Sequence, residues 1–96
     1  ALVSDAGTPT ISDSGYKLVK AVSKEGIKVE PIPGPSALIT AISASGINPN
    51  NFMFLGFLSK IQIDKTNSLK KLKESEVAGV FYESPNRILE TLELLK

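Results

Sequence analysis

The stretch Ser4-Asp5-Ala6-Gly7-Thr8-Pro9 follows the apolar residues Ala1-Leu2-Val3 and precedes Ile11-Ser12-Asp13-Ser14-Gly15-Tyr16. An apolar strand that enters a loop of small residues and then opens a helix is the arrangement in which open α/β sheets bind ligands. Gly7 can adopt a positive φ, Pro9 fixes the turn, and Asp5 can accept hydrogen bonds from loop amides or from a ligand. Taken alone, the stretch also suits a plain turn in which Asp5 caps its own amides.

A second loop of this kind, Pro31-Ile32-Pro33-Gly34-Pro35-Ser36-Ala37, lies further along the chain. It ends a strand-like run from Ile27 to Ile32 and opens another helix. The β-α-β-α order up to Gly46 predicts a parallel pair of strands joined by a right-handed crossover, with helices covering the sheet. We therefore expect an α/β fold in which both loops lie at one edge of the sheet.

Two helices are expected in the first half of the chain. Asp13 or Ser14 can cap the first, which ends at Gly26. Ser36 can cap the second, which extends from Ala37 to Ser45. The second helix is apolar nearly all round, which predicts burial between two layers.

The run Asn48-Pro49-Asn50-Asn51 is the clearest break in the sequence. We place a domain boundary there, with residues 1–48 as the C-terminal part of one α/β domain, 49–51 as a linker and 52–96 as the N-terminal part of a second. The elements expected in the second half are a strand from Phe52 to Leu58, a short helix from Leu69 to Glu74, a strand from Val77 to Glu83, and a final helix with Ser84 as N-cap and Pro85 as its first residue.

Composition narrows the possible functions. The 96 residues carry 11 basic and 10 acidic side chains, so any nucleic-acid affinity must come from a local patch. The absence of Cys excludes disulfides and thiolate zinc sites and is compatible with a reducing cytoplasm, where we expect the protein to be. The absence of His removes the usual general base and the usual transition-metal ligand. No apolar run approaches the roughly 20 residues needed to span a membrane.

Four motifs in order, SDAGTP, PIPGPSA, GFL and FYESPNR, resemble those of the bacterial 16S ribosomal RNA 2′-O-ribose methyltransferases of the tetrapyrrole (corrin/porphyrin) methylase superfamily. The resemblance covers nearly the whole chain. It implies a parallel-sheet sandwich of two α/β domains, of which this chain is an internal piece. It also implies S-adenosyl-L-methionine as cofactor, bound in the cleft between the domains.

The resemblance identifies the residues expected to bind this cofactor. They form three groups: Asp5, Ala6, Gly7, Thr10 and Ile11 on one wall, Ser36 and Ala37 on a second, and Tyr82 with Glu83 facing them from the other domain. Each residue also has a structural alternative. Ser36 could be only a helix cap, Tyr82 a core residue, and Glu83 a helix-end charge paired with Arg87.

Methyl transfer to a ribose hydroxyl requires an aligned and partly deprotonated nucleophile. Without imidazole, the general base would have to be Asp13, Glu83 or a lysine with a lowered pKa, and the sequence does not choose among them. The expected partner is 16S ribosomal RNA in the small ribosomal subunit. Segment 60–73 contains several lysines and one acidic residue, Asp64, so its side chains are the candidate phosphate contacts. The alternative is an ordinary solvated surface. The lysines are Lys60, Lys65, Lys70, Lys71 and Lys73.

This chain departs from the family pattern at three places, one of which is Asn86, where histidine is common. Ser14 replaces a usual proline, and the loop Gly56-Phe57-Leu58-Ser59-Lys60-Ile61 lacks the usual proline and glycine, which weakens the RNA assignment more than the cofactor assignment. Two alternatives stay open: a tetrapyrrole C-methylase of the same superfamily, or a non-catalytic α/β binding module. Uncovered strand edges also predict self-association, hence a homodimer.

Overall fold

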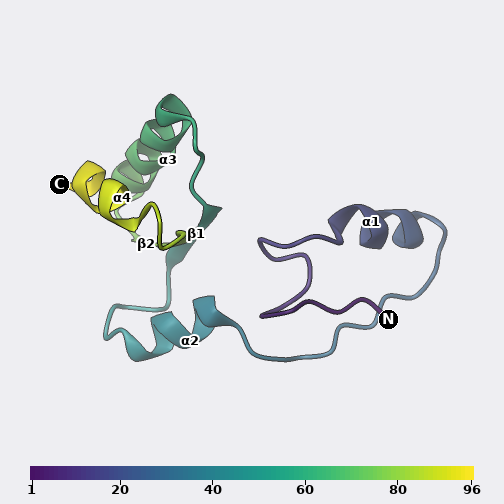
Figure 1. Cartoon of the computed structure of the whole chain (residues 1–96). Helices are drawn as coiled ribbons and strands as arrows, with labels where there is room; N and C mark the ends of the chain where they lie inside the picture. The colour runs from purple at the N-terminus through teal and green to yellow at the C-terminus, as the bar shows by residue number, and fades with distance from the viewer. The chain divides into compact units, whose positions relative to one another are not determined.

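The computed structural model describes all 96 residues, which form two compact units, Ala1–Ala41 and Ile42–Lys96. Figure 1 shows the elements in chain order: α1 (Tyr16–Lys24), α2 (Ala37–Ala44), β1 (Phe52–Phe57), α3 (Gln62–Ser75), β2 (Ala78–Tyr82) and α4 (Ile88–Leu95). The two strands pair in parallel, which confirms the α/β class. Each helix is too short or too polar to span a lipid bilayer.

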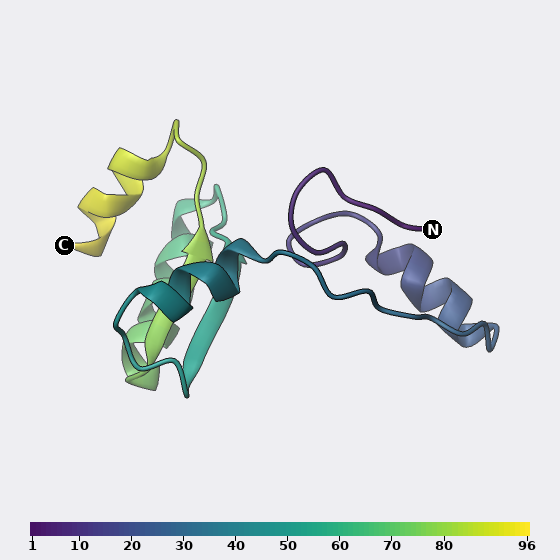
Figure 2. The ribbon, with the colours of Figure 1, turned by 90° about the horizontal axis from the view of Figure 1, so that it is seen from below.

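The second unit is a β-α-β unit followed by α4. Figure 2 shows β1 and β2 side by side, with α3 along the sheet. A Cβ atom on Gly79 would overlap the side chain of Leu72, so α3 rests directly on β2 at a position that leaves no room for a side chain. Leu58, at 4 % exposure, and Thr91, at 0 %, are buried in this unit.

The first unit holds α1 and the two long loops. Gly15 is the N-cap of α1 and has a φ of 111°. At the other end, Gly26 N–H donates to Ser23 O and Ile27 N–H donates to Val22 O, the double hydrogen bond that ends a helix on a left-handed glycine. The expected stop at Gly26 is therefore confirmed, whereas the expected caps Asp13 and Ser14 are wrong by one or two residues.

The strands predicted in the first unit are wrong, because neither residues 1–3 nor residues 27–32 pair in a ladder. Pro31 and Pro33 have no N–H to donate, and an isolated two-stranded parallel pair is marginal without covering layers. Val3 and Ile32 are accordingly 82 % and 84 % exposed.

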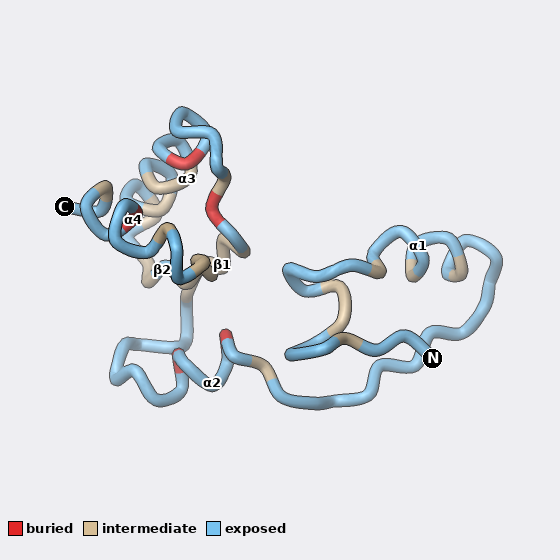
Figure 3. The backbone as a smooth tube through the Cα atoms, in the orientation of Figure 1, coloured by how far each residue is buried: buried red, intermediate tan, exposed pale blue.

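The prediction that α2 is buried between layers is also wrong. Leu38 and Ile42 are buried, but Ile39, between them in sequence, is 53 % exposed. Leu38 is the single buried residue of the first unit, and the other residues of this unit are exposed or half-buried (Figure 3). The rest of the chain therefore covers only part of the apolar surface of α2.

Both strands of the second unit are confirmed within one residue at each end. The polar helix is longer than the expected Leu69 to Glu74, because it begins seven residues earlier, at Gln62, and ends one residue later, at Ser75. The final helix begins at Ile88, not at Pro85, because Arg87 N–H donates to Ser84 O and closes a turn first.

Candidate functional site

The first candidate loop is a chain of left-handed turns. Gly7, Thr10, Ser12 and Gly15 have φ values of 72°, 74°, 53° and 111°. The Ser4 hydroxyl donates to Gly7 O at 2.8 Å, and Ile11 N–H donates to Thr8 O at 3.3 Å. The hydrogen bond that closes the turn thus comes from Ser4 and not, as the plain-turn alternative required, from Asp5.

Thr10 is the most unusual residue of this loop. A β-branched side chain at φ 74° is a backbone outlier that costs about 1–3 kcal/mol. The amide of Thr10 is held by a hydrogen bond to Ser14 O, and its methyl carbon lies near Gly15, 3.5 Å from where a Cβ atom would stand. Such strain persists where the fold holds a loop in one working shape, as ligand-binding loops require.

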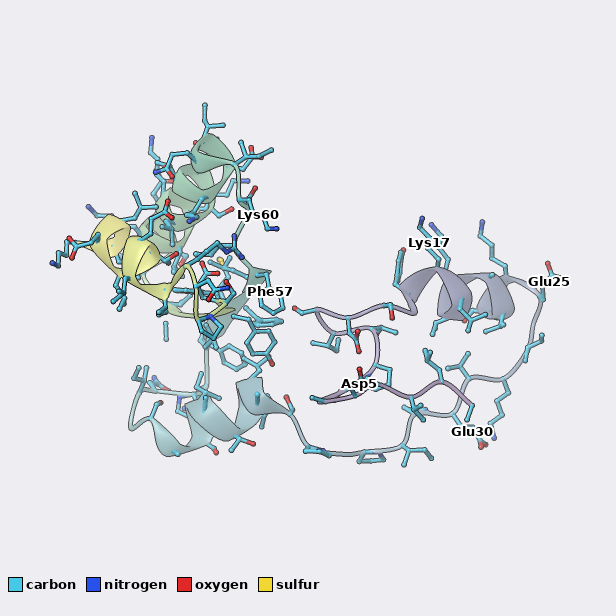
Figure 4. All side chains as sticks on the ribbon, in the orientation of Figure 1. Asp5, Lys17, Glu25, Glu30, Phe57 and Lys60 are labelled. Atoms are coloured by element: carbon cyan, nitrogen blue, oxygen red, sulfur yellow. The ribbon has the colours of Figure 1, made fainter.

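The loop offers an open surface to a ligand. Asp5, Ala6, Gly7 and Ile11 are exposed and Thr10 is half-buried, and Figure 4 shows the Asp5 side chain in this loop. A Cβ atom built on Gly7 meets nothing within 4 Å. The amides of residues 5–7 take part in no hydrogen bond within the chain, so small residues and free backbone donors lie together here.

Ser36 and Ala37 belong to the same unit as the first loop. The expected cap is confirmed, because Ser36 Oγ accepts the Ile39 amide at 3.4 Å and Ser36 O accepts the Thr40 amide at 2.9 Å. Ala37 is exposed at the first turn of α2. The hydroxyl hydrogen of Ser36 is not needed for the cap and stays available as a donor.

Tyr82 and Glu83 lie in the other unit, at the end of β2. The side chain of Glu83 is 2 % exposed and both of its oxygens are occupied. Oε1 accepts the Ser84 amide at 2.8 Å and faces Arg87 Nη2 at 3.0 Å, while Oε2 accepts the Thr91 hydroxyl at 2.7 Å. The pair of Glu83 with Arg87 is the structural alternative expected from the sequence, and it is confirmed.

This network decides the acid-base properties of Glu83. The Thr91 hydroxyl, followed by the Ser84 amide and the charges of Arg87 and Lys65, holds the pKa of the Glu83 carboxyl below its usual value, although burial opposes the shift. A carboxylate that is bonded this fully is a weak proton acceptor at neutral pH. Its evident task is to fix the turn between β2 and α4.

Lys65 corrects the expected basic surface. Its side chain is buried, at 3 % exposure, and its Nζ donates to Thr91 Oγ1 at 3.5 Å. It is therefore a partner of the Glu83 network and not a phosphate ligand. The other four lysines of the segment are exposed: Lys60, Lys70, Lys71 and Lys73.

Sequence reasoning missed two residues of this edge. Thr91 joins Lys65 to Glu83, and the spacing of four between positions 83, 87 and 91 was the available signal, although Glu83 and Arg87 precede the first residue of α4. Phe57 was placed in the strand and in the altered loop Gly56-Phe57-Leu58-Ser59-Lys60-Ile61 without a role of its own, yet it is 53 % exposed beside Tyr82. No local pattern marks that contact.

Comparison with known proteins gives a consistent result. The profile of the tetrapyrrole (corrin/porphyrin) methylases matches residues 1–96. The chain is 52 % identical over 96 residues to a protein of Vibrio cholerae named ribosomal RNA small subunit methyltransferase I, covering 97 % of this chain and 32 % of the relative. Proteins of the same name match from Hydrogenobaculum, at 52 % identity over 99 % of this chain and 41 % of the relative, and from Bacillus subtilis, at 49 % over 96 % and 32 %. The chain thus spans about a third of the length of most of these relatives.

Proposed function

Because this chain belongs to the tetrapyrrole (corrin/porphyrin) methylases, we propose that it acts within an S-adenosyl-L-methionine-dependent methyltransferase that modifies the 2′-hydroxyl of a cytidine in 16S ribosomal RNA. The observation that carries the proposal is the strained, open loop Asp5–Ile11, in a chain whose relatives are named as ribosomal RNA methyltransferases.

The first loop fits the cofactor. An amino acid and an adenosine need fixed donors, acceptors and room, and the loop supplies unpaired amides at residues 5–7 and open space beside Gly7. Ser36, Ala37 and Tyr82 are the further residues proposed to line the site, with the backbone of Glu83. When bound, the cofactor supplies an electrophilic methyl group on a sulfonium sulfur.

The side chain of Glu83 contributes by position. Its carboxylate is bound by Thr91 and Arg87, so it holds the Tyr82–Glu83 backbone rather than accepting the ribose proton. Of the carboxylates considered as general base, Asp13 is exposed and accepts only the neighbouring Ser14 amide, so it is the better candidate. Positioning of the hydroxyl supplies much of the remaining acceleration.

RNA binding is proposed for the exposed lysines of the segment 60–73. Lys70, Lys71 and Lys73 lie on α3 and Lys60 lies just before it, and all four are exposed. Exposed ammonium groups bind phosphates by displacing counterions, so this contact would weaken with salt. A ribosomal substrate would place the protein in the cytoplasm.

The arrangement of domains follows the same proposal. Residues 1–48 would belong to a cofactor-binding domain and 52–96 to a second α/β domain, joined by 49–51. Exposed apolar side chains such as Ile32 and Leu89, at 84 % and 77 %, would meet other surfaces of the protein or a second copy, as in a homodimer.

Transfer of a labelled methyl group tests the proposal. The full-length protein is incubated with labelled S-adenosyl-L-methionine and small ribosomal subunits, and the RNA is digested to nucleosides. We expect the label in 2′-O-methylcytidine. Label in a base, or transfer only to a tetrapyrrole supplied in parallel, would contradict the proposal and favour another branch of the family.

A further inference from the structure

Phe57 ends β1 as a large aromatic side chain that is 53 % exposed (Figure 4). A strand that lies against a helix ordinarily ends with its large apolar groups covered. Here the ring stands at the carboxyl edge of two parallel strands, where open α/β folds bind ligands. This exposure therefore calls for an explanation in terms of what the ring could contact.

A backbone irregularity sets the direction of Phe57. Phe54 pairs with Val80 and Phe57 with Tyr82, so three steps along β1 match two along β2. Gly56, with φ 63°, lies within this bulge. In a regular strand, side chains three positions apart point to opposite faces. The extra residue brings both rings to Tyr82.

The contacts confirm this convergence. The ring of Phe54 lies 5.2 Å from that of Tyr82 at 73°, and the ring of Phe57 lies 5.4 Å from it at 56°. The Phe54–Tyr82 contact is edge-to-face and the Phe57–Tyr82 contact is tilted, and aromatic pairs at these separations attract one another beyond the burial of their area. The left-handed Gly56 and the bulge therefore direct the Phe57 ring toward Tyr82 while leaving it half exposed to solvent. Bulges beside binding sites re-aim side chains in this way.

The charges around Phe57 favour a polyanion. Lys60 is exposed three residues further on, and no acidic residue stands between Phe57 and Asp64. Glu83, which follows Tyr82 at the same edge, is 2 % exposed and neutralised by Arg87. A flat ring with an exposed ammonium group nearby suits an unpaired nucleotide, whose base stacks and whose phosphate is negative.

We propose that Phe57 is a stacking residue for an unpaired base of the RNA substrate, with Tyr82 packing against its ring and Lys60 contacting the adjoining phosphate. This inference rests on the proposed function and adds to it a substrate-contacting residue and a single-stranded substrate. The adenine of the cofactor is the competing occupant, and the experiment separates the two.

The test uses the full-length protein and the variants Phe57→Leu and Phe57→Trp, with Ile63→Ala as the matched control, since Ile63 is also apolar and is 67 % exposed. Leucine keeps the packing against Tyr82 but removes the flat ring, whereas tryptophan keeps a stacking surface. Binding of a fluorescent single-stranded oligocytidylate is measured by anisotropy, and binding of S-adenosyl-L-methionine by calorimetry.

Phe57→Leu should lose RNA affinity by about 5- to 100-fold, the range of one base stack. Phe57→Trp should bind RNA like the wild type, and cofactor affinity should not change in any variant. Unchanged RNA affinity in Phe57→Leu, an equal loss in Ile63→Ala, or a loss confined to the cofactor would each overturn the stacking role. A wild-type protein that methylates small-subunit RNA while Phe57→Leu binds it normally refutes this inference alone; a wild type that binds no RNA refutes the proposed function as well.

Discussion

Replacing Gly7 by alanine tests whether the left-handed backbone of the first loop contributes to cofactor affinity. Gly7 has φ 72°, and a Cβ atom there would meet no protein atom within 4 Å. The substitution therefore adds no clash within the chain, only the cost of a left-handed residue, about 1–2 kcal/mol. Because the loop is exposed, the free variant can relax to a negative φ, and binding must restore the left-handed shape.

That cost corresponds to a loss of cofactor affinity of about 5- to 30-fold if the loop binds S-adenosyl-L-methionine in the shape described here. Any greater loss measures contact between the new methyl group and the ligand. Gly26→Ala is the control, since Gly26 has φ 70° and equally open surroundings but ends α1. It should lower stability by a similar amount without changing affinity.

Calorimetric titration of the folded full-length variants with S-adenosyl-L-methionine gives both affinities, and thermal unfolding gives both stabilities. Wild-type affinity in Gly7→Ala refutes the assignment of the loop. An equal loss of affinity in Gly26→Ala would show that both substitutions act by general destabilisation, which also refutes a specific role of Gly7 in binding the cofactor.

Three further predictions concern the other features. Thr91→Val removes the largest cause of the lowered Glu83 pKa. The stability that this carboxylate contributes is present above its ordinary pKa of 4.5 and is lost as the pH falls through the lowered pKa of the folded protein, so the variant should unfold in acid at a higher pH than the wild type. Circular dichroism measures both acid transitions, and coincident transitions would count against the network. Lys70→Glu with Lys71→Glu should weaken RNA binding and flatten its salt dependence while cofactor affinity stays the same; an unchanged salt slope would make these lysines an ordinary surface. Residues 1–96 alone should self-associate in light scattering and show no methyl transfer, and an active monomer would contradict this.

The second unit was predictable because its signals are local. The apolar run beginning at Phe52 and the run ending at Tyr82 are each long enough to be strands. A helix lies between them in the sequence, and two strands joined by a helix usually pair in parallel. Helix ends were harder. The turn at Ser84 delays α4, and the left-handed Gly15 displaces two better caps, because tertiary context outweighs capping preference.

The first unit shows where local signals fail. Residues 27–32 have strand composition, but a strand is stabilised by its neighbours, and no ladder forms here. The loop residues Asp5 to Ile11 were grouped by motif, whereas the left-handed shape of Thr10 could not be inferred from a β-branched residue. The hydrogen bond between Lys65 on α3 and Thr91 on α4 joins positions 26 residues apart, which no local pattern of the sequence indicates.

The most direct test of the central claim is nucleoside mass spectrometry of 16S ribosomal RNA from a strain that lacks the full-length protein. We expect that one 2′-O-methylcytidine is lost and that the wild-type gene restores it. Gly7→Val, which adds a β-branched side chain at a left-handed position, should restore it poorly. An unchanged methylation pattern in the deletion strain would show that the protein does not methylate 16S ribosomal RNA.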